Sequence, residues 1–244
     1  MNRVIALLYG MVCYAFFFVT FLYAIAFVED FPVPRTIDAG LRAPMTEALV
    51  INMVLMALFA IQHSVMARPQ FKAWWTQFVP KPVERSTYVL FATALLALLC
   101  WQWRPIPAVI WSVGGLGAVI LQAVFWLGWG VVLLSTFLIS HFELFGLSQV
   151  WANMRGKAES APVFRTPLLY GFVRHPIYLG FVLAFWPAPT MTAGHLLFAV
   201  ATLGYMLIAI QFEERDLIGT FGEAYVVYRR RVSMLIPLPP RKSA

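Results

Sequence analysis

A short run of chemically distinctive residues, from Arg174 to Gly180, follows a polar stretch and opens an apolar one. Pro176 suits the first turn of a helix, because proline has no N–H group to leave unpaired there. His175 would then cap the helix, beside free backbone donors and the positive end of the helix dipole, where anionic groups bind well. Tyr178 adds an aromatic face with a hydroxyl group. The run predicts a ligand-binding site.

A second polar group follows the last long apolar run. It begins with Glu213-Glu214 and continues through Phe221-Gly222 to Tyr225 and Tyr228. A helix that passes from lipid into water also carries charges and interfacial aromatic residues at this point. The residue types alone therefore leave two interpretations open, an ordinary interfacial helix end and a second part of the binding site.

The ordered combination of these motifs resembles the isoprenylcysteine carboxyl methyltransferase-like family, which includes phospholipid methyltransferases. The pattern is Arg-His-Pro-x-Tyr-x-Gly, Glu-Glu-x-x-Leu, Phe-Gly-x-x-Tyr-x-x-Tyr and a final Val-x-x-x-Ile-Pro, within residues 165–237. The resemblance implies an integral membrane methyltransferase with S-adenosylmethionine as its methyl donor. It also implies that six residues bind this cofactor: Tyr170, His175, Pro176, Ile177, Tyr178 and Glu213.

The chain departs from the family pattern in two places. Residues 168–173 read Leu-Leu-Tyr-Gly-Phe-Val where many members have Gly-Pro-Tyr-Arg-Tyr-Val, so only the central tyrosine is kept. In the isoprenylcysteine enzymes an arginine four residues before the first Glu binds the carboxylate of the substrate, and Ala209 stands at that position here. The resemblance therefore disfavours a carboxylate substrate.

Four other stretches resemble one subgroup of the family, the methanethiol S-methyltransferases, which make dimethyl sulfide. These stretches are residues 60–68, 83–88, 140–147 and 185–186. The implied reaction is the S-adenosylmethionine-dependent methylation of methanethiol, a small thiol. Two alternatives stay open: a membrane methyltransferase that acts on an isoprenoid thiol or carboxylate or on a phospholipid amine, and a non-enzymatic membrane transporter or scaffold.

His63 and His141 are the candidate catalytic residues, because each is predicted at the cytoplasmic end of an apolar run. A small thiol is mostly protonated at neutral pH, and a histidine could accept its proton. A histidine at a membrane boundary is also often only a satisfied interfacial side chain. The pocket is expected to be small and apolar, because four bulky side chains are predicted near it: Phe142, Phe145, Phe185 and Trp186.

No metal site is predicted, because none of the four histidines has another histidine three or four residues away on the same helix face. Cys13 and Cys100 both lie inside apolar runs, so a disulfide framework is not expected either. The formal net charge of +7 comes from short basic runs between apolar stretches, which membrane topology explains better than nucleic-acid binding.

Membrane helices must position these residues, since 61% of the chain is hydrophobic and 12% charged. About 20 apolar residues cross a bilayer core, and three runs near that length are residues 4–28, 48–67 and 86–103. A longer run, residues 105–140, is expected to tilt, to project from the membrane or to break, with Gly114-Gly115 as the candidate break point. Residues 177–186 and 196–212 predict a helical hairpin whose first arm is short and ends at Pro187-Ala188-Pro189.

The sequence thus predicts an all-α fold, a polytopic transmembrane bundle of five or six membrane segments whose C-terminal hairpin forms the cofactor site. Residues 1–244 are expected to form one domain, with a four-span part at 1–140 and the S-adenosylmethionine-binding region at 165–237. Basic residues concentrate in alternate loops, which predicts cytoplasmic N- and C-termini in a bacterial inner membrane. The expected partners are a small thiol and membrane lipid, with no nucleic acid and no obligate protein partner.

Overall fold

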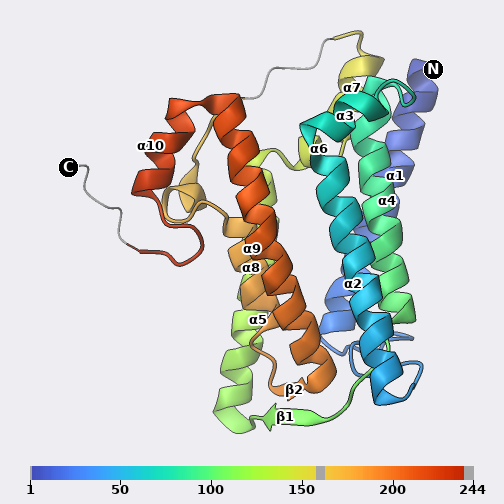
Figure 1. Ribbon diagram of the computed structural model, residues 1–244, viewed down its shortest axis with the longest axis vertical. Coiled ribbons are helices and arrows are strands. Elements are labelled where there is room, and N and C mark those ends of the chain that lie inside the picture. Colours follow the sequence, from blue (N-terminus) through green and yellow to red (C-terminus); the bar gives the residue numbers. More distant parts are fainter. Residues whose placement is uncertain (1, 158–162, 239–244) are drawn as a thin grey trace. The chain divides into compact units, whose positions relative to one another are not determined.

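The computed structural model describes residues 2–157 and 163–238, and most of them are helical (Figure 1). In this part of the chain, five helices are long and apolar enough to cross a membrane: α1 (Arg3–Val28), α2 (Met45–Ala67), α4 (Lys81–Gln102), α5 (Gly115–Ile139) and α9 (Ala193–Phe221). The predicted polytopic helical fold is confirmed. The terminal residues whose cytoplasmic location was predicted, 1 and 239–244, lie outside the described residues.

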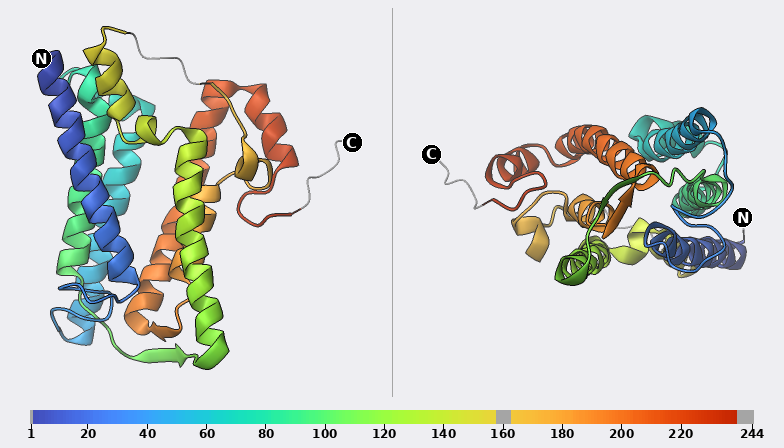
Figure 2. Two further views of the ribbon diagram at one scale, coloured as in Figure 1. Left: turned by 180° about the vertical axis from the view of Figure 1, so that it is seen from behind. Right: turned by 90° about the horizontal axis from the view of Figure 1, so that it is seen from below.

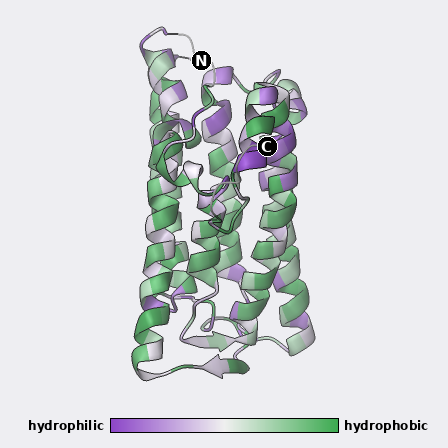
Figure 3. Cartoon of the chain, turned by 90° about the vertical axis from the view of Figure 1, so that its left-hand side faces the viewer, coloured by the Kyte–Doolittle hydropathy of each residue, from purple (hydrophilic) through white to green (hydrophobic). Residues whose placement is uncertain are grey.

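The long helices expose apolar side chains that a water-soluble protein would bury. On α1, the side chains of Val12 and Val19 are 67% and 65% exposed. Hydrophobic residues dominate the middle of the long helices in Figure 3. A helix also satisfies its backbone N–H and C=O groups internally, as lipid requires. These surfaces are therefore suited to contact with lipid.

Shorter elements lie between the long helices or, in the case of α10, follow the last of them. They are α3 (Pro69–Trp75), β1 (Val109–Ser112), α6 (His141–Leu144), α7 (Leu147–Met154), the 3₁₀-helix η1 (Leu168–Gly171), α8 (Pro176–Phe185), β2 (Thr190–Thr192) and α10 (Glu223–Arg231). Of the three alternatives expected for residues 105–140, the structure has the break at Gly114-Gly115, because α5 begins at Gly115, whose φ of 57° favours glycine. The pairing of β1 with β2 was not predicted from the sequence.

The described residues divide into two compact units. The first comprises residues 2–110, 142–157 and 192–197, and the second comprises residues 111–141, 163–191 and 198–238. In the first unit, α4 packs against α1 and α2, and α7 packs against α1 and α4. A reciprocal pair of hydrogen bonds, each 2.8 Å long, joins the buried Asn52 amide to the backbone of Arg104.

In the second unit, α5 and α8 run side by side in opposite directions (Figures 1 and 2). Two glycines make the contact close. A Cβ atom on Gly128 would lie 2.6 Å from the backbone N of Ala184, and one on Gly180 would lie 2.7 Å from a methyl carbon of Val132. The backbones of the two helices can touch because neither glycine has a side chain. The predicted hairpin with a short first arm is confirmed by α8 and α9.

We expect Gly128→Ala to destabilise the protein by about 1–3 kcal/mol, because the new methyl group must push apart two closely packed backbones. Gly130→Ala is the matched control on the same helix, since nothing lies within 4 Å of its added Cβ. Thermal unfolding in detergent measures both variants. Equal melting temperatures for the two variants would contradict the proposed close packing of α5 and α8.

Candidate active site

The start of α8 is fixed by the segment that follows α10. Pro176 occupies the first turn of the helix, and no side chain caps its N–H groups. The backbone N of Arg174 donates to Ser233 O at 2.8 Å, and that of His175 donates to Met234 O at 3.2 Å. Residues far apart in the sequence therefore hold the helix start in place.

A buried carboxylate forms the centre of the site. Glu214 on α9 accepts from Arg174 Nε at 2.7 Å and lies 3.2 Å from His175 Nε2. Arg229 on α10 adds a third partner, with its Nη1 atom 3.6 Å from the second carboxylate oxygen. The side chains of Glu214 and His175 are only 8% and 3% exposed. A buried carboxylate is stable only when it is paired, so Glu214 ties α8, α9 and α10 together.

The neighbouring carboxylate, Glu213, is in a different environment. Its side chain is 43% exposed, because successive residues of a helix point about 100° apart. Its Oε2 atom accepts from the Tyr178 hydroxyl at 3.1 Å and lies 3.7 Å from His175 Nδ1. Glu213 is thus oriented on one side and open to a ligand on the other.

Aromatic side chains from three segments surround this carboxylate pair. Tyr228 donates to the backbone O of Tyr170 at 2.6 Å, and the ring of Phe164 contacts those of Tyr225 and Tyr228. Burial raises the pKa of Tyr228 to about 12. Burial, assisted by the negative charge of Glu213, also raises the pKa of Tyr170. These tyrosines are therefore neutral at cellular pH and able to donate hydrogen bonds.

Two of the tyrosine hydroxyls lack a hydrogen-bond partner among the described residues. Within the described residues, the buried hydroxyl groups of Tyr170 and Tyr225 have no hydrogen-bond partner. Buried polar groups usually have one, so an exception needs a physical reason. A polar ligand beside Glu213 would supply it.

The six residues predicted to bind a cofactor all belong to the second unit. The structure joins His175 and Tyr178 to Glu213 and places Tyr170 near enough for the charge of Glu213 to raise its pKa, while Pro176 and Ile177 form the first turn of α8. Their binding role stays a prediction. Sequence reasoning gave no role in the site to Glu214 or Arg229. Their contacts join segments that are distant in the sequence; the pairing of Arg174 with Glu214, for example, spans 40 residues. The only sequence feature that pointed to Glu214 was its position beside Glu213 in the Glu-Glu motif.

The two candidate catalytic histidines lie in different units. His141, at the start of α6 in the second unit, is buried, lies 2.9 Å from Thr136 Oγ1 and stacks on Phe137 with the ring centroids 4.4 Å apart. Burial lowers the pKa of His141, so its ring is neutral and can accept a proton at neutral pH.

His63 belongs to the first unit, where α2 packs against α4. The Tyr88 hydroxyl lies 3.0 Å from His63 Nε2, and the Arg85 guanidinium stacks 4.8 Å above the Tyr88 ring. The structure thus gives each histidine a hydroxyl partner.

Named relatives cover almost the whole chain. The chain is 61% identical to methanethiol S-methyltransferase 1 of Bradyrhizobium diazoefficiens over 236 residues, which is 96% of this chain and 83% of that protein. It is 58% identical to methanethiol S-methyltransferase of Mycobacterium tuberculosis over 242 residues, which is 99% of both chains. The chain belongs to the methanethiol S-methyltransferase family.

A more distant relative of this methanethiol S-methyltransferase family member is nurim of Homo sapiens. The two are 29% identical over 193 residues, which is 74% of this chain and 70% of nurim. No protein-family model matches the chain. No solved structure matches it significantly.

One expectation about this methanethiol S-methyltransferase family member is wrong. Phe185 and Trp186 were expected near the pocket, but the 10-residue α8 ends at Phe185 and Trp186 follows it, so both lie at the end opposite His175. A helix rises 1.5 Å per residue, so about 15 Å separates the two ends. The sequence motif indicated a site at the start of α8. It did not indicate that the helix carries the chain away from that site, so that the residues at its far end lie at a distance from it.

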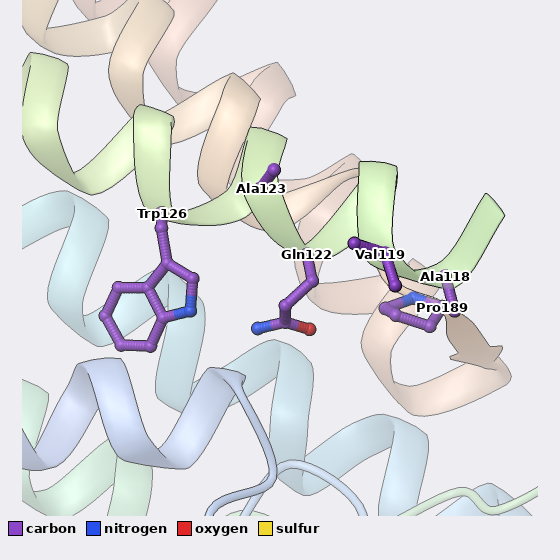
Figure 4. A pocket seen from close by; sticks show the side chains of 6 residues that line it. All are labelled: Ala118, Val119, Gln122, Ala123, Trp126 and Pro189. Carbon is purple, nitrogen blue, oxygen red and sulfur yellow. The ribbon is translucent and has the colours of Figure 1, made fainter. Parts of the chain in front are cut away.

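A hollow of about 440 Å³ in the second unit lies away from the candidate site (Figure 4). Gln122 and Trp126 extend into it from the N-terminal half of α5, and Pro189 borders it. Because α5 and α8 are antiparallel, this half of α5 lies beside the end of α8 and not beside its start. Within the described residues, no group of three or more His, Cys, Asp or Glu side chains could hold a metal ion.

In this methanethiol S-methyltransferase family member, we expect Glu214→Gln to destabilise the folded protein by about 3–5 kcal/mol, because it leaves the largely buried Arg174 without its counter-charge. Glu213→Gln is the matched control, and it should change stability by less than about 1 kcal/mol because that side chain is half exposed. Chemical unfolding in detergent measures both variants. A stable Glu214→Gln protein would show that Glu214 does not organise the site.

Proposed function

We propose that this chain transfers a methyl group from S-adenosylmethionine to methanethiol and so forms dimethyl sulfide. The observation that carries the proposal is the half-exposed carboxylate of Glu213, which Tyr178 and His175 orient beside the uncapped start of α8. Kinship over nearly the whole chain with proteins named methanethiol S-methyltransferase supports the choice of acceptor.

The polar groups of the site fit S-adenosylmethionine. The carboxylate of Glu213 suits the ribose hydroxyls or the ammonium group, both of which donate hydrogen bonds. The start of α8, formed by His175, Pro176 and Ile177, suits the carboxylate of the methionine part. Tyr170 contributes a buried hydroxyl without a partner among the described residues. The same six residues that the family motif indicates therefore make up the proposed cofactor site.

When bound, S-adenosylmethionine supplies an electrophilic methyl group on a sulfonium sulfur. The protein then has to orient the thiol, exclude water and accept a proton. His141 is the proposed proton acceptor in the unit that contains the cofactor site, and its lowered pKa keeps the ring neutral. His63, beside Tyr88, is proposed as a second catalytic residue. No metal is needed for these steps.

The position of Ala209 supports a small, uncharged acceptor. Ala209 is 8% exposed on α9, one helical turn before Glu213, and it offers no positive charge to a carboxylate. A thiol of two heavy atoms gains at most about 1.5 kcal/mol of binding energy per atom. We infer that the enzyme binds its acceptor weakly and depends on alignment for its rate.

We also propose that the chain lies in a bacterial inner membrane, in contact with lipid and with both termini in the cytoplasm. Basic residues on the short helices support this orientation, because α3 carries Lys72 and α10 ends in Arg229, Arg230 and Arg231. Positive residues remain on the cytoplasmic side of membrane proteins. No protein partner is required for the proposed reaction.

We expect Glu213→Gln to raise the dissociation constant of S-adenosylmethionine at least tenfold, because hydrogen bonds to a charged group contribute about 1.5–3 kcal/mol. His175→Ala should also weaken binding of the donor. Calorimetric titration of the detergent-solubilised protein measures these changes. Glu223→Gln on α10 is the control, since it removes the same charge from an exposed position of the same unit and should leave the affinity unchanged.

We expect purified protein in lipid vesicles to convert methanethiol and S-adenosylmethionine into dimethyl sulfide, detected in the headspace by gas chromatography. Farnesylcysteine should be methylated at least tenfold more slowly, because the site offers no cation at Ala209 for its carboxylate. Phosphatidylethanolamine should also be methylated at least tenfold more slowly, because the relatives that cover the chain are named for methanethiol as acceptor. Faster methylation of either compound would favour the alternative acceptors. Binding of no methyl donor at all would instead favour a transporter or scaffold.

A further inference from the structure

Thr136 and His141 form a buried pair whose hydrogen-bond directions can be assigned. The Thr136 hydroxyl is 2.8 Å from the backbone O of Leu133 and 2.9 Å from His141 Nδ1. A hydroxyl has one proton, and a carbonyl oxygen can only accept. Both contacts are hydrogen bonds only if the hydroxyl donates to Leu133 and His141 Nδ1–H donates to the hydroxyl.

We propose that Thr136 is a positioning residue that holds His141 in its Nδ1–H tautomer, so that Nε2 is the ring nitrogen that accepts the proton of the thiol substrate. In a neutral imidazole only one nitrogen carries a proton, and the hydrogen bond made by one nitrogen decides the state of the other. The tautomer follows from this chain alone. The proton-acceptor role of Nε2 rests on the proposed function.

The surroundings of the pair hold the ring in one orientation. The rings of His141 and Phe137 are stacked, with an angle of 7° between their planes. His141 and Thr136 are 8% and 7% exposed, so water competes little for the hydrogen bond between them. Ser140 N donates to Thr136 O at 3.1 Å, which fixes the turn that brings His141 back towards the hydroxyl.

Helix packing places this pair at the same end of the α5–α8 contact as the candidate site. Val132 on α5 meets Gly180 on α8, and the two helices are antiparallel. Thr136 lies one turn after Val132, while Pro176 lies one turn before Gly180. Thr136 and the start of α8 are therefore at the same level within the second unit.

The chemical step balances with the methyl donor as the co-reactant. The thiol S–H bond breaks, and its proton goes to His141 Nε2. The electron pair left on the thiol sulfur forms the new sulfur–methyl bond. The bond between the methyl carbon and the donor sulfonium breaks, and its electron pair stays on the donor sulfur. The hydrogen bond from His141 Nδ1–H to the Thr136 hydroxyl persists throughout the step. Water later removes the proton from Nε2.

Nitrogen NMR of protein labelled with ¹⁵N-histidine, in detergent and without donor or thiol, tests the tautomer directly. The chain has four histidines, and His141→Gln identifies the signal of His141. We expect the wild-type protein and Thr136→Ser to carry the proton on Nδ1. Thr136→Val, which replaces the hydroxyl with a methyl group of similar size, should shift at least half of the population to Nε2–H.

The wild-type spectrum needs no variant, so it decides the tautomer even if Thr136→Val does not fold. A neutral His141 with its proton on Nε2 in the wild-type protein would overturn the proposal. An unchanged spectrum in a folded Thr136→Val protein would overturn the role of Thr136. Neither result depends on the identity of the substrate.

Activity measurements then test the catalytic consequence. We expect Thr136→Val to lower kcat for methanethiol about tenfold, with KM and donor affinity changed by less than twofold, and Thr136→Ser to restore most of the rate. An active wild-type protein with an equally active Thr136→Val variant would contradict the role of Nε2. An inactive wild-type protein with the expected tautomer would instead contradict the proposed function and leave the positioning by Thr136 intact.

Discussion

The pairing of one buried carboxylate with three cationic or titratable side chains is the constraint on which the candidate site depends. Glu214 on α9 lies within reach of Arg174 and His175, which precede α8, and of Arg229 on α10, so the contacts join three segments of the chain. An unpaired carboxylate in this environment would be strongly disfavoured, so the segments have to meet. The contacts that stabilise the buried carboxylate are thus the same contacts that bring the residues of the candidate site together.

Glu213 and Glu214 are adjacent and identical in type, but the helix places them in different environments. A rotation of about 100° per residue buries one carboxylate and leaves the other half exposed. The buried carboxylate is paired with Arg174, His175 and Arg229. The exposed one is oriented by Tyr178 and stays accessible to solvent, as the proposed binding role requires. Rigid support behind an open carboxylate is a physical basis for ligand orientation without a large conformational change.

The glycine contact between α5 and α8 also fixes the positions of residues in the second unit. It aligns the two helices in register, so that residues one turn beyond it, including Thr136, reach the level of the start of α8. Helix packing is more rigid than loop structure. A histidine placed by such packing, and held by a hydroxyl group and a stacked ring, keeps one ring orientation. Positioning of this kind is valuable for a reaction that depends chiefly on alignment.

The sequence by itself determined the membrane helices, because the length of an apolar run decides whether it can cross a bilayer, and glycine and proline decide where it breaks. The motif around His175 also indicated the location of the site through its resemblance to a family. Only the tertiary structure separated Glu214 from Glu213, paired Arg174 with a residue 40 positions away, placed Trp186 at the far end of α8 and gave His141 its hydroxyl partner. These features depend on helix register and side-chain direction, which packing between distant segments decides and local sequence does not.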